Sequence, residues 1–326
     1  MTAHELSTLA TGYWPAAALI AAVELNLFDA LGDTPAPAEA VAMKLGVDAG
    51  RLMELLDGLA SIDLLEKSPN GYVIAGGVRA LLTRSSPTCM LDGLRYNADL
   101  YRHWSNLAAV VRGDVPPAGR MQLGDDPALT RRFVLGMEAK GRAFAPAIAT
   151  ALDLGDIRTL LDVGSGPGTL TRHLLRERPS LHATLLDLPP VLAVAKELWR
   201  GESTLDRLTF HPADYRVGRL PGDFDCVVYA GALHQESAET AAALMKRMRQ
   251  ALRPGGRLFV IDLMLDDDRT SPAFSAMFQL NMLLLRPDAK VFSVGDLTRM
   301  LTASGFTDIR KSDITNTPYH VVAGAT

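Results

Sequence analysis

A short glycine-rich turn carries the residues whose types and spacing point most clearly to chemistry. It lies within residues 160–168, where an apolar run is followed by Gly164, Gly166 and Gly168. The apolar run predicts a strand that is buried on both faces, and residues 169–178 have leucines at helical spacing. Closely spaced glycines allow a tight turn and let a ligand approach the backbone. The segment therefore predicts a nucleotide-type pocket between a parallel strand and a helix N-terminus.

The glycine spacing and two acidic residues indicate which nucleotide this pocket would bind. A pyrophosphate-binding fingerprint has its third glycine three residues after the second, whereas here the interval is two. Asp162, two residues before the first glycine, would repel phosphate but attract an ammonium group. Asp187 ends a predicted strand about 25 residues later, close to the usual distance for a ribose-binding carboxylate. These features together predict S-adenosylmethionine; the alternative is a loop-capping acid in an ordinary doubly wound sheet.

Other polar residues recur at predicted strand ends. Strands and helices alternate from residue 156 onward, which predicts a parallel sheet with an antiparallel pair at its edge. In such sheets ligands bind at the carboxyl ends of the strands. Asp214 and Tyr215 suit an adenine, through a carboxylate for the exocyclic amine and an aromatic face for the ring. The alternative for Asp214 is a cap on the following loop.

His234 is the candidate general base. It follows the predicted strand 224–230, where a substrate would meet a cofactor lying across the first strands. An imidazole there can take a proton from a phenol or enol near neutral pH. Asp262 lies at the end of the next predicted strand, 257–263, and can hold the other ring nitrogen, or it caps a helix or loop instead.

Composition limits the classes of protein that the chain can belong to. Its 326 residues suffice for two domains, and a net charge of −4 gives no basic surface for nucleic acid. The two cysteines, Cys89 and Cys226, are far apart and in no redox spacing, so we expect a cytoplasmic location. The histidines show no ligand spacing either, so we expect no metal site. The apolar run 16–23 is too short to span a membrane, and we expect no membrane association or targeting signal.

The first 88 residues predict a winged-helix pattern. Apolar residues at helical spacing in 5–31 are followed by two short helices and a hairpin around residues 64–74. Such a pattern can bind DNA or form a dimer. The second short helix has Arg51 as its only cation, against Asp48, Glu54 and Asp57. This balance would repel phosphate, so the pattern favours dimerisation.

We therefore divide the chain into a winged-helix-like dimerisation domain (1–88), a helical, substrate-lining region (89–155) and a Rossmann-like catalytic domain (156–326). The fold class is α/β. In the middle region Trp104, Phe133 and Met137 are candidates for an aromatic acceptor pocket, although residues of these types are also typical of a core.

Taken together, these segments resemble the small-molecule O-methyltransferases that join a dimerisation domain to a class I methyltransferase domain. Bacterial natural-product, plant caffeate-type and acetylserotonin-type enzymes belong to this group. The resemblance covers nearly the whole chain, including residues 160–168, 186–189, 252–256 and 280–306. It implies a homodimer that binds S-adenosylmethionine through Asp162, Gly164, Gly166, Asp187, Leu188, Asp214 and Tyr215.

The same resemblance implies that His234 is the general base and that Asp262 stands where plant members have a glutamate beside it. The chain departs from the family where His-Asp-Trp is usual, because it has His-Gln-Glu, and Val291 falls near the place of a second glutamate. Met282 and Arg286 fall on the helix that faces the acceptor. Arg286 is unusual there, either pairing with an acceptor oxygen or lying at the surface.

The predicted reaction is methyl transfer to a hydroxyl of a small, aromatic or polyketide-like metabolite. Two alternatives remain on the same fold. One is C-methylation of an enolisable or activated ring carbon, which needs the same base and cofactor. The other is a non-methylating activity, because fold does not settle function.

Overall fold

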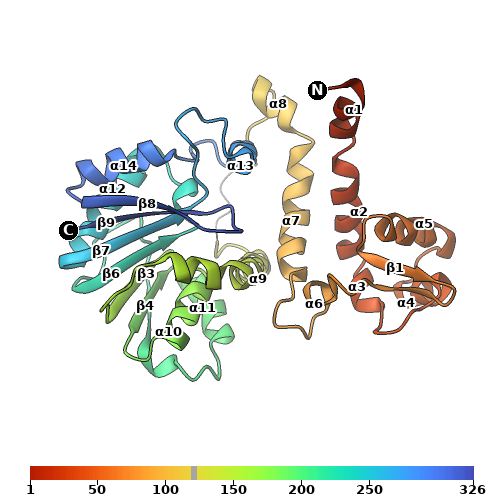
Figure 1. Cartoon of the computed structure of the whole chain (residues 1–326), viewed down its shortest axis with the longest axis horizontal. Coiled ribbons are helices and arrows are strands. Elements are labelled where there is room, and N and C mark those ends of the chain that lie inside the picture. Colours follow the sequence, from red (N-terminus) through yellow and green to blue (C-terminus); the bar gives the residue numbers. More distant parts are fainter. Residues whose placement is uncertain (119–122) are drawn as a thin grey trace. The chain divides into compact units, whose positions relative to one another are not determined.

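The computed structural model describes residues 1–118 and 123–326 and divides the chain into two compact units, Met1–Tyr101 and Arg102–Thr326 (Figure 1). The helical region expected at 89–155 is shared between the two units. Its first long helix, α7 (Leu91–Trp104), crosses the boundary.

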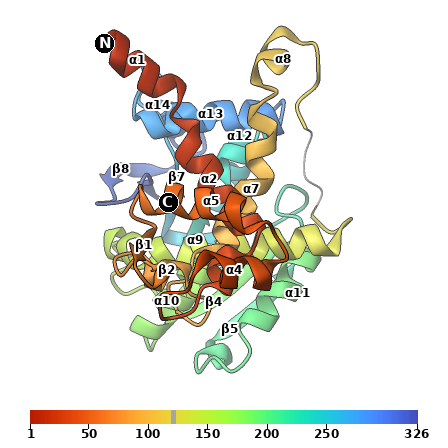
Figure 2. The ribbon, with the colours of Figure 1, turned by 90° about the vertical axis from the view of Figure 1, so that its right-hand side faces the viewer.

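The N-terminal unit has the expected order of helices followed by a hairpin (Figure 2). Asp48 begins α5 by accepting the backbone N–H of Arg51 at 2.8 Å, as an N-cap residue does. Leu52, Leu56 and Leu59 then face the core of the unit at helical spacing. Its elements are α1 (Ala3–Ala10), α2 (Tyr13–Glu24), α3 (Leu27–Ala30), α4 (Ala38–Leu45), α5 (Ala49–Ala60), β1 (Leu65–Ser68), β2 (Gly71–Ile74) and α6 (Arg79–Leu82).

Helices α1 and α2 present apolar side chains to solvent. Leu6, Leu9, Tyr13 and Trp14 are each more than half exposed. Among the described residues, one helical stretch, Ala3–Glu24, is long and apolar enough to cross a membrane by length and composition alone. It is longer than the 16–23 run considered from sequence. Several exposed large apolar side chains on adjacent helices are also typical of a protein interface.

The second unit is built on a seven-stranded sheet of order β5-β4-β3-β6-β7-β9-β8. The first five strands are parallel, β9 pairs antiparallel with β7, and β8 pairs antiparallel with β9. This confirms the predicted α/β class and the antiparallel edge. The strands are β3 (Thr159–Val163), β4 (His182–Asp187), β5 (Leu208–Pro212), β6 (Phe224–Ala230), β7 (Leu252–Asp262), β8 (Thr307–Asp313) and β9 (His320–Ala325).

Helices cover both faces of this sheet, so its central strands are apolar on both sides. Consecutive residues of β3 show the division: Leu161 packs in the cluster with α12 and α14, and Leu160 in the cluster with α10 and α11. The helices of the unit are α8 (Leu107–Arg112), α9 (Pro127–Ala151), α10 (Thr169–Glu177), α11 (Pro189–Leu198), α12 (Ala238–Ala251), α13 (Ala273–Leu285) and α14 (Val294–Ala303), with short 3-10 turns η1 (Leu205–Arg207) and η2 (Leu233–Gln235).

Two element boundaries differ from the sequence-based expectation. Strand β7 begins at Leu252, not Arg257, because Leu252 pairs with Phe224 and the chain then bulges before Arg257 pairs with Cys226. Helix α13 begins at Ala273, seven residues before the segment that resembles the family's substrate helix. Its sequence is apolar almost throughout, so no polar face marks it as an amphipathic helix.

We predict that Gly168→Ala destabilises the protein more than Gly201→Ala. Both glycines have a left-handed φ, +74° and +82°, which costs a residue with a Cβ roughly 1–2 kcal/mol. A Cβ on Gly168 would also lie 2.5 Å from Cδ1 of Leu185, whereas one on Gly201 would have open space. The extra crowding should lower the free energy of unfolding by about a further 1–3 kcal/mol, measurable by urea denaturation. Equal losses in the two variants would contradict the packing shown here.

Candidate active site

The glycine turn follows β3 and leads directly into α10. Gly164, Gly166 and Gly168 all have left-handed φ angles, between +55° and +74°. A Cβ on Gly164 would lie 3.1 Å from Cε1 of Tyr215, while one on Gly166 would meet no atom within 4 Å. Gly164 and Gly168 are thus required by packing, whereas the space beside Gly166 is open.

Asp187 holds this turn in place. Its two carboxylate oxygens accept the backbone N–H groups of Gly166 and Leu188, each at 2.7 Å. Burial raises the pKa of Asp187 to about 6, against the opposing effect of these two hydrogen bonds. The predicted ribose-binding carboxylate is therefore fixed at the end of β4, beside the glycine turn.

Asp162 lies in β3, one residue before the strand ends. It is 4% exposed and accepts a hydrogen bond from the hydroxyl of Thr171 in α10 at 2.6 Å. Burial raises its pKa to about 7, the nearby Asp187 adds to the rise, and the Thr171 hydrogen bond opposes it. A carboxylate with these surroundings gains most from a cationic ligand.

Asp214 and Tyr215 follow β5, but their side chains have different surroundings. Asp214 is partly exposed and accepts the backbone N–H and Nε of Arg216. Tyr215 is buried, donates its hydroxyl to Glu236 at 2.9 Å, and packs its ring edge-on against Tyr229. In this arrangement the Tyr215 ring supports the glycine turn, and Asp214 is the residue of the two that faces outward.

His234 and Asp262 form the pair expected from sequence. His234 lies in η2 after β6, and Asp262 ends β7, the neighbouring strand. Nδ1 of His234 lies 2.7 Å from Oδ1 of Asp262, and the backbone N–H of His234 donates to Oδ2 of the same carboxylate. Because an ionised carboxylate only accepts, it places the ring proton on Nδ1 and leaves Nε2 with a lone pair.

Helix α13 adds residues beside this pair. The ring of Phe278 packs edge-on against His234, with centroids 4.9 Å apart. Asn281 accepts the indole N–H of Trp104 at 3.2 Å, and Met282 is buried next to it in the chain. The predicted residues Trp104 and Met282 thus lie on or against the helix that also contacts the imidazole.

The remaining predicted acceptor residues are not brought to His234 by a contact of this kind. Phe133 packs on α9 against Val191 and Val194 of α11, in the same cluster as Leu188. Met137 is partly buried one turn further along α9. Arg286 is the C-cap residue that follows α13, and its backbone N–H donates to the carbonyl of Met282 at 2.8 Å.

Four residues of the site were not foreseen: Thr171, Glu236, Phe278 and Asn281. Phe278 stands four residues before Met282, so helical spacing from that residue is a signal that could have found it. Asn281 directly precedes Met282, and helical spacing does not mark it. Thr171 and Glu236 have no such signal, because each partner lies on a different element.

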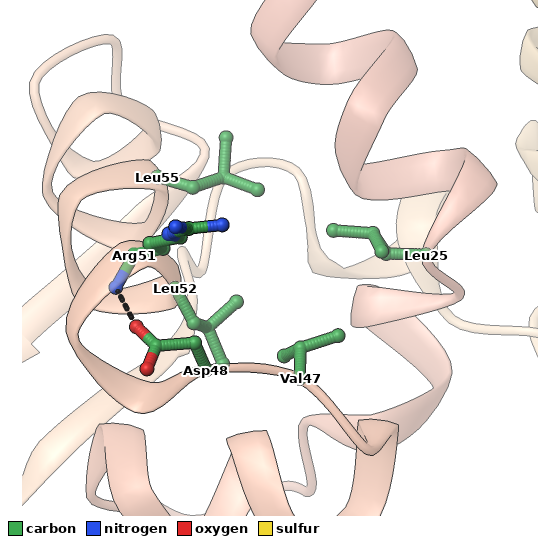
Figure 3. A pocket seen from close by; sticks show the side chains of 6 residues that line it. All are labelled: Leu25, Val47, Asp48, Arg51, Leu52 and Leu55. Atoms are coloured by element: carbon green, nitrogen blue, oxygen red, sulfur yellow. Dashed lines mark hydrogen bonds between the residues drawn. The ribbon is translucent and has the colours of Figure 1, made fainter.

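Other parts of the described structure offer no comparable chemistry. A cavity in the N-terminal unit is lined by Leu25, Val47, Asp48, Arg51, Leu52 and Leu55 (Figure 3). The close-up shows the Arg51 side chain among leucines, with Asp48 engaged at the helix N-terminus. Within residues 1–118 and 123–326, no group of three His, Cys, Asp or Glu side chains is placed to hold a metal ion.

The sheet order, with a glycine turn at the carboxyl end of its central strand, defines the second unit as a class I methyltransferase domain. Family models match an O-methyltransferase dimerisation domain at residues 7–84 and an O-methyltransferase domain at residues 118–307. The chain therefore belongs to the O-methyltransferase family, as its motifs had indicated.

Individual relatives are similar to this chain over nearly its full length. The chain is 32% identical to the tetracenomycin polyketide synthesis 8-O-methyl transferase TcmO of Streptomyces glaucescens, over 95% of this chain and 93% of that protein. It is 30% identical to the N,N-dimethyltransferase OxyT of Streptomyces rimosus, over 93% and 90%. The crystal structure of human N-acetylserotonin methyltransferase in complex with SAM superposes with a TM-score of 0.89 at 26% identity, covering 99% of this chain and 97% of that one.

The raised pKa of Asp162 predicts a pH dependence of stability. Below about pH 4 this carboxyl is protonated in the folded and the unfolded chain alike, and between pH 4 and 7 only the folded chain keeps the proton. Its contribution to the free energy of unfolding is therefore lost as the pH rises towards 7. The stability difference between wild type and Asp162→Asn, measured by urea denaturation without ligand, should shift in favour of the variant from pH 5 to pH 8.

Asp225→Asn is the matched control. Burial tends to raise the pKa of Asp225, but hydrogen bonds from the backbone N–H groups of Arg158 and Thr159 lower it below its ordinary value. Asp225 therefore titrates below the ordinary range of an aspartate, and its stability difference from wild type should stay constant between pH 5 and 8. A constant difference for Asp162→Asn as well would mean that this carboxylate is already ionised at pH 5.

Proposed function

We propose that this protein transfers the methyl group of S-adenosylmethionine to a hydroxyl of a small aromatic or polyketide-like metabolite, with His234 as the general base. The observation that carries the proposal is the contact of 2.7 Å between Nδ1 of His234 and Asp262, at the same sheet edge as the glycine turn. The match to TcmO, named for an O-methyl transfer in polyketide synthesis, supports a hydroxyl acceptor of this kind.

The residues of the glycine turn fit an S-adenosylmethionine ligand. Ser165 has a buried hydroxyl without a hydrogen-bond partner in the described part of the chain, and Gly166 has open space where a Cβ would be. Asp162 would attract the ammonium group, and Asp187 has two of its roughly four lone-pair sites left for ribose hydroxyls. Leu188 and Asp214 would contact the nucleoside. The cofactor, when bound, supplies a methyl group on a positively charged sulfur.

The chain's own residues then orient the acceptor and remove one proton. Nε2 of His234 takes the proton from the acceptor hydroxyl, and Asp262 stabilises the resulting imidazolium. Phe278, packed edge-on, restricts the imidazole to this orientation. Trp104, Met282 and, further along α9, Phe133 and Met137 would exclude water from the acceptor.

The acceptor atom itself has two further candidates. C-methylation of an enolisable carbon would use the same base. N-methylation is favoured by one observation, the 30% identity to OxyT, which is named an N,N-dimethyltransferase. Mass spectrometry with NMR of the product of an active acceptor distinguishes the three. We also infer that two copies of the chain associate through the dimerisation domain, using the exposed apolar face of α1 and α2.

We predict that His234→Ala retains cofactor affinity and loses turnover by about 10²- to 10⁴-fold, because the acceptor proton then has no base. Affinity would be measured by calorimetry with S-adenosylhomocysteine. Turnover would be measured with the phenol that wild type methylates fastest in a mass-shift screen.

His173→Ala is the control, because it removes a histidine that also contacts a carboxylate, Glu177 at 3.1 Å, but on the outer face of α10. It should behave as wild type. Full activity of His234→Ala would remove the general-base assignment.

A second prediction concerns acceptor recognition by Arg286. If its guanidinium binds an acceptor carboxylate or polar oxygen, Arg286→Ala should raise the KM for the acceptor and leave the affinity for S-adenosylhomocysteine unchanged. Arg286→Lys should recover part of the loss, because it retains the charge without the planar fork. An unaltered acceptor KM in Arg286→Ala would dispose of the idea.

A further inference from the structure

A buried hydrogen bond links two loops at the carboxyl edge of the sheet. Tyr215 follows β5 and Glu236 follows η2 after β6, and the Tyr215 hydroxyl donates to Oε1 of Glu236 at 2.9 Å. The two residues are 7% and 2% exposed. Strands β4 and β3 lie between β5 and β6 in the sheet, so the bond spans the region beneath the glycine turn.

The ring of Tyr215 also contacts that turn. Its Cε1 would be 3.1 Å from a Cβ on Gly164, and Cβ of Ala232, in the loop before His234, would be 3.5 Å from the same point. The glycine turn, the loop after β5 and the loop after β6 are therefore packed on one another. Movement of Tyr215 would be transmitted to both of the other loops.

Glu236 is tied closely to His234. Its backbone N–H donates to the carbonyl of Leu233 at 3.0 Å, which closes the 3-10 turn that contains the histidine. On its other side the same turn is held by Asp262, which accepts the His234 backbone N–H. The turn is thus anchored from both flanks, by Asp262 on β7 and by Tyr215 after β5.

Tyr215 remains a hydrogen-bond donor throughout the working pH range. Burial raises its pKa well above the ordinary value of 10.0, and the neighbouring Glu236 adds to the rise. Loss of its hydroxyl would leave the Glu236 carboxylate buried without this donor, which is costly in a low-dielectric interior.

We propose that Glu236 and Tyr215 are positioning residues that hold the His234 turn in register with the glycine turn, so that base and cofactor are aligned together. This inference rests on His234 being the general base. Neither residue needs to touch the acceptor: Glu236 acts through the backbone of the turn, and Tyr215 through Glu236 and Gly164.

The test compares four variants with wild type. Tyr215→Phe removes the donor, and Glu236→Gln keeps an oxygen that can accept from Tyr215. Tyr229→Phe is the matched control, because its hydroxyl is buried in the same cluster and its ring packs against that of Tyr215, but it makes no hydrogen bond to Glu236. Tyr215→Phe combined with Glu236→Leu removes the bond and the buried carboxylate together.

We expect Tyr215→Phe to lower kcat roughly 10- to 100-fold with the acceptor KM unchanged, for the phenol that wild type methylates fastest, since small misplacements of a catalytic group have effects of this size. Glu236→Gln should retain most of the turnover, and Tyr229→Phe all of it. The double variant should recover the thermal midpoint of wild type, because the Glu236 carboxylate is removed together with its donor, but it should not recover the kcat.

A second readout does not need an acceptor. In the complex with S-adenosylhomocysteine, the imidazole NMR signals of His234, assigned by their loss in His234→Ala, should shift in Tyr215→Phe and the double variant but not in Tyr229→Phe. Recovery of kcat together with the thermal midpoint in the double variant, or unmoved His234 signals, would overturn the proposal. If His234→Ala is fully active, the general base has been misassigned; if it is inactive while Tyr215→Phe turns over normally, only the positioning role fails.

Discussion

The site depends first on one carboxylate, that of Asp187, binding two backbone N–H groups at once. The bonds to Gly166 and Leu188 fix the glycine turn after β3 against the end of β4. Because the turn has three left-handed glycines, little in its own backbone preference would select this one conformation. The carboxylate supplies that selection, and the start of α10 follows from it. An aspartate at this point therefore serves the fold and the proposed ribose contact with the same two oxygens.

This arrangement places negative charge where burial opposes it. The pKa of Asp162 is raised to about 7 and that of Asp187 to about 6, in both cases first because of burial. Such surroundings stabilise the apoprotein less than apolar residues would, and they fit a ligand that brings a positive charge and hydroxyl donors. The His234 turn is held in a similar way by few residues. Asp262 binds both the ring and the backbone of His234, and Tyr215 bonds to Glu236 at the other end of that turn.

The sequence predicts much of the fold and of the candidate site, and there are physical reasons why it does not predict the rest. The hydrophobic periodicity and the glycine spacing are enough to predict β3, the glycine turn and α10. The positions of Asp187, His234 and Asp262 at predicted strand ends place them at one edge of the sheet, because the carboxyl ends of parallel strands lie at the same edge. The pairing of His234 with Asp262 follows from adjacent strands. The hydrogen bond of Tyr215 to Glu236 and its packing against Gly164 do not follow from the sequence, because they depend on contacts across three elements. The start of helix α13 is also hard to predict, because a helix that is apolar almost throughout has no polar face to reveal its helical periodicity.

The most direct test of the account is calorimetric titration of S-adenosylmethionine and S-adenosylhomocysteine at pH 6.5, in two buffers that differ in ionisation enthalpy. The comparison of buffers gives the number of protons exchanged on binding. Asp162 and Asp187 are partly protonated near this pH, and an ammonium group and ribose hydroxyls favour their charged forms. The account predicts that both ligands bind and that protons are released. Binding of neither would contradict the assignment of the glycine turn, and binding without proton release would contradict the roles given to the two carboxylates.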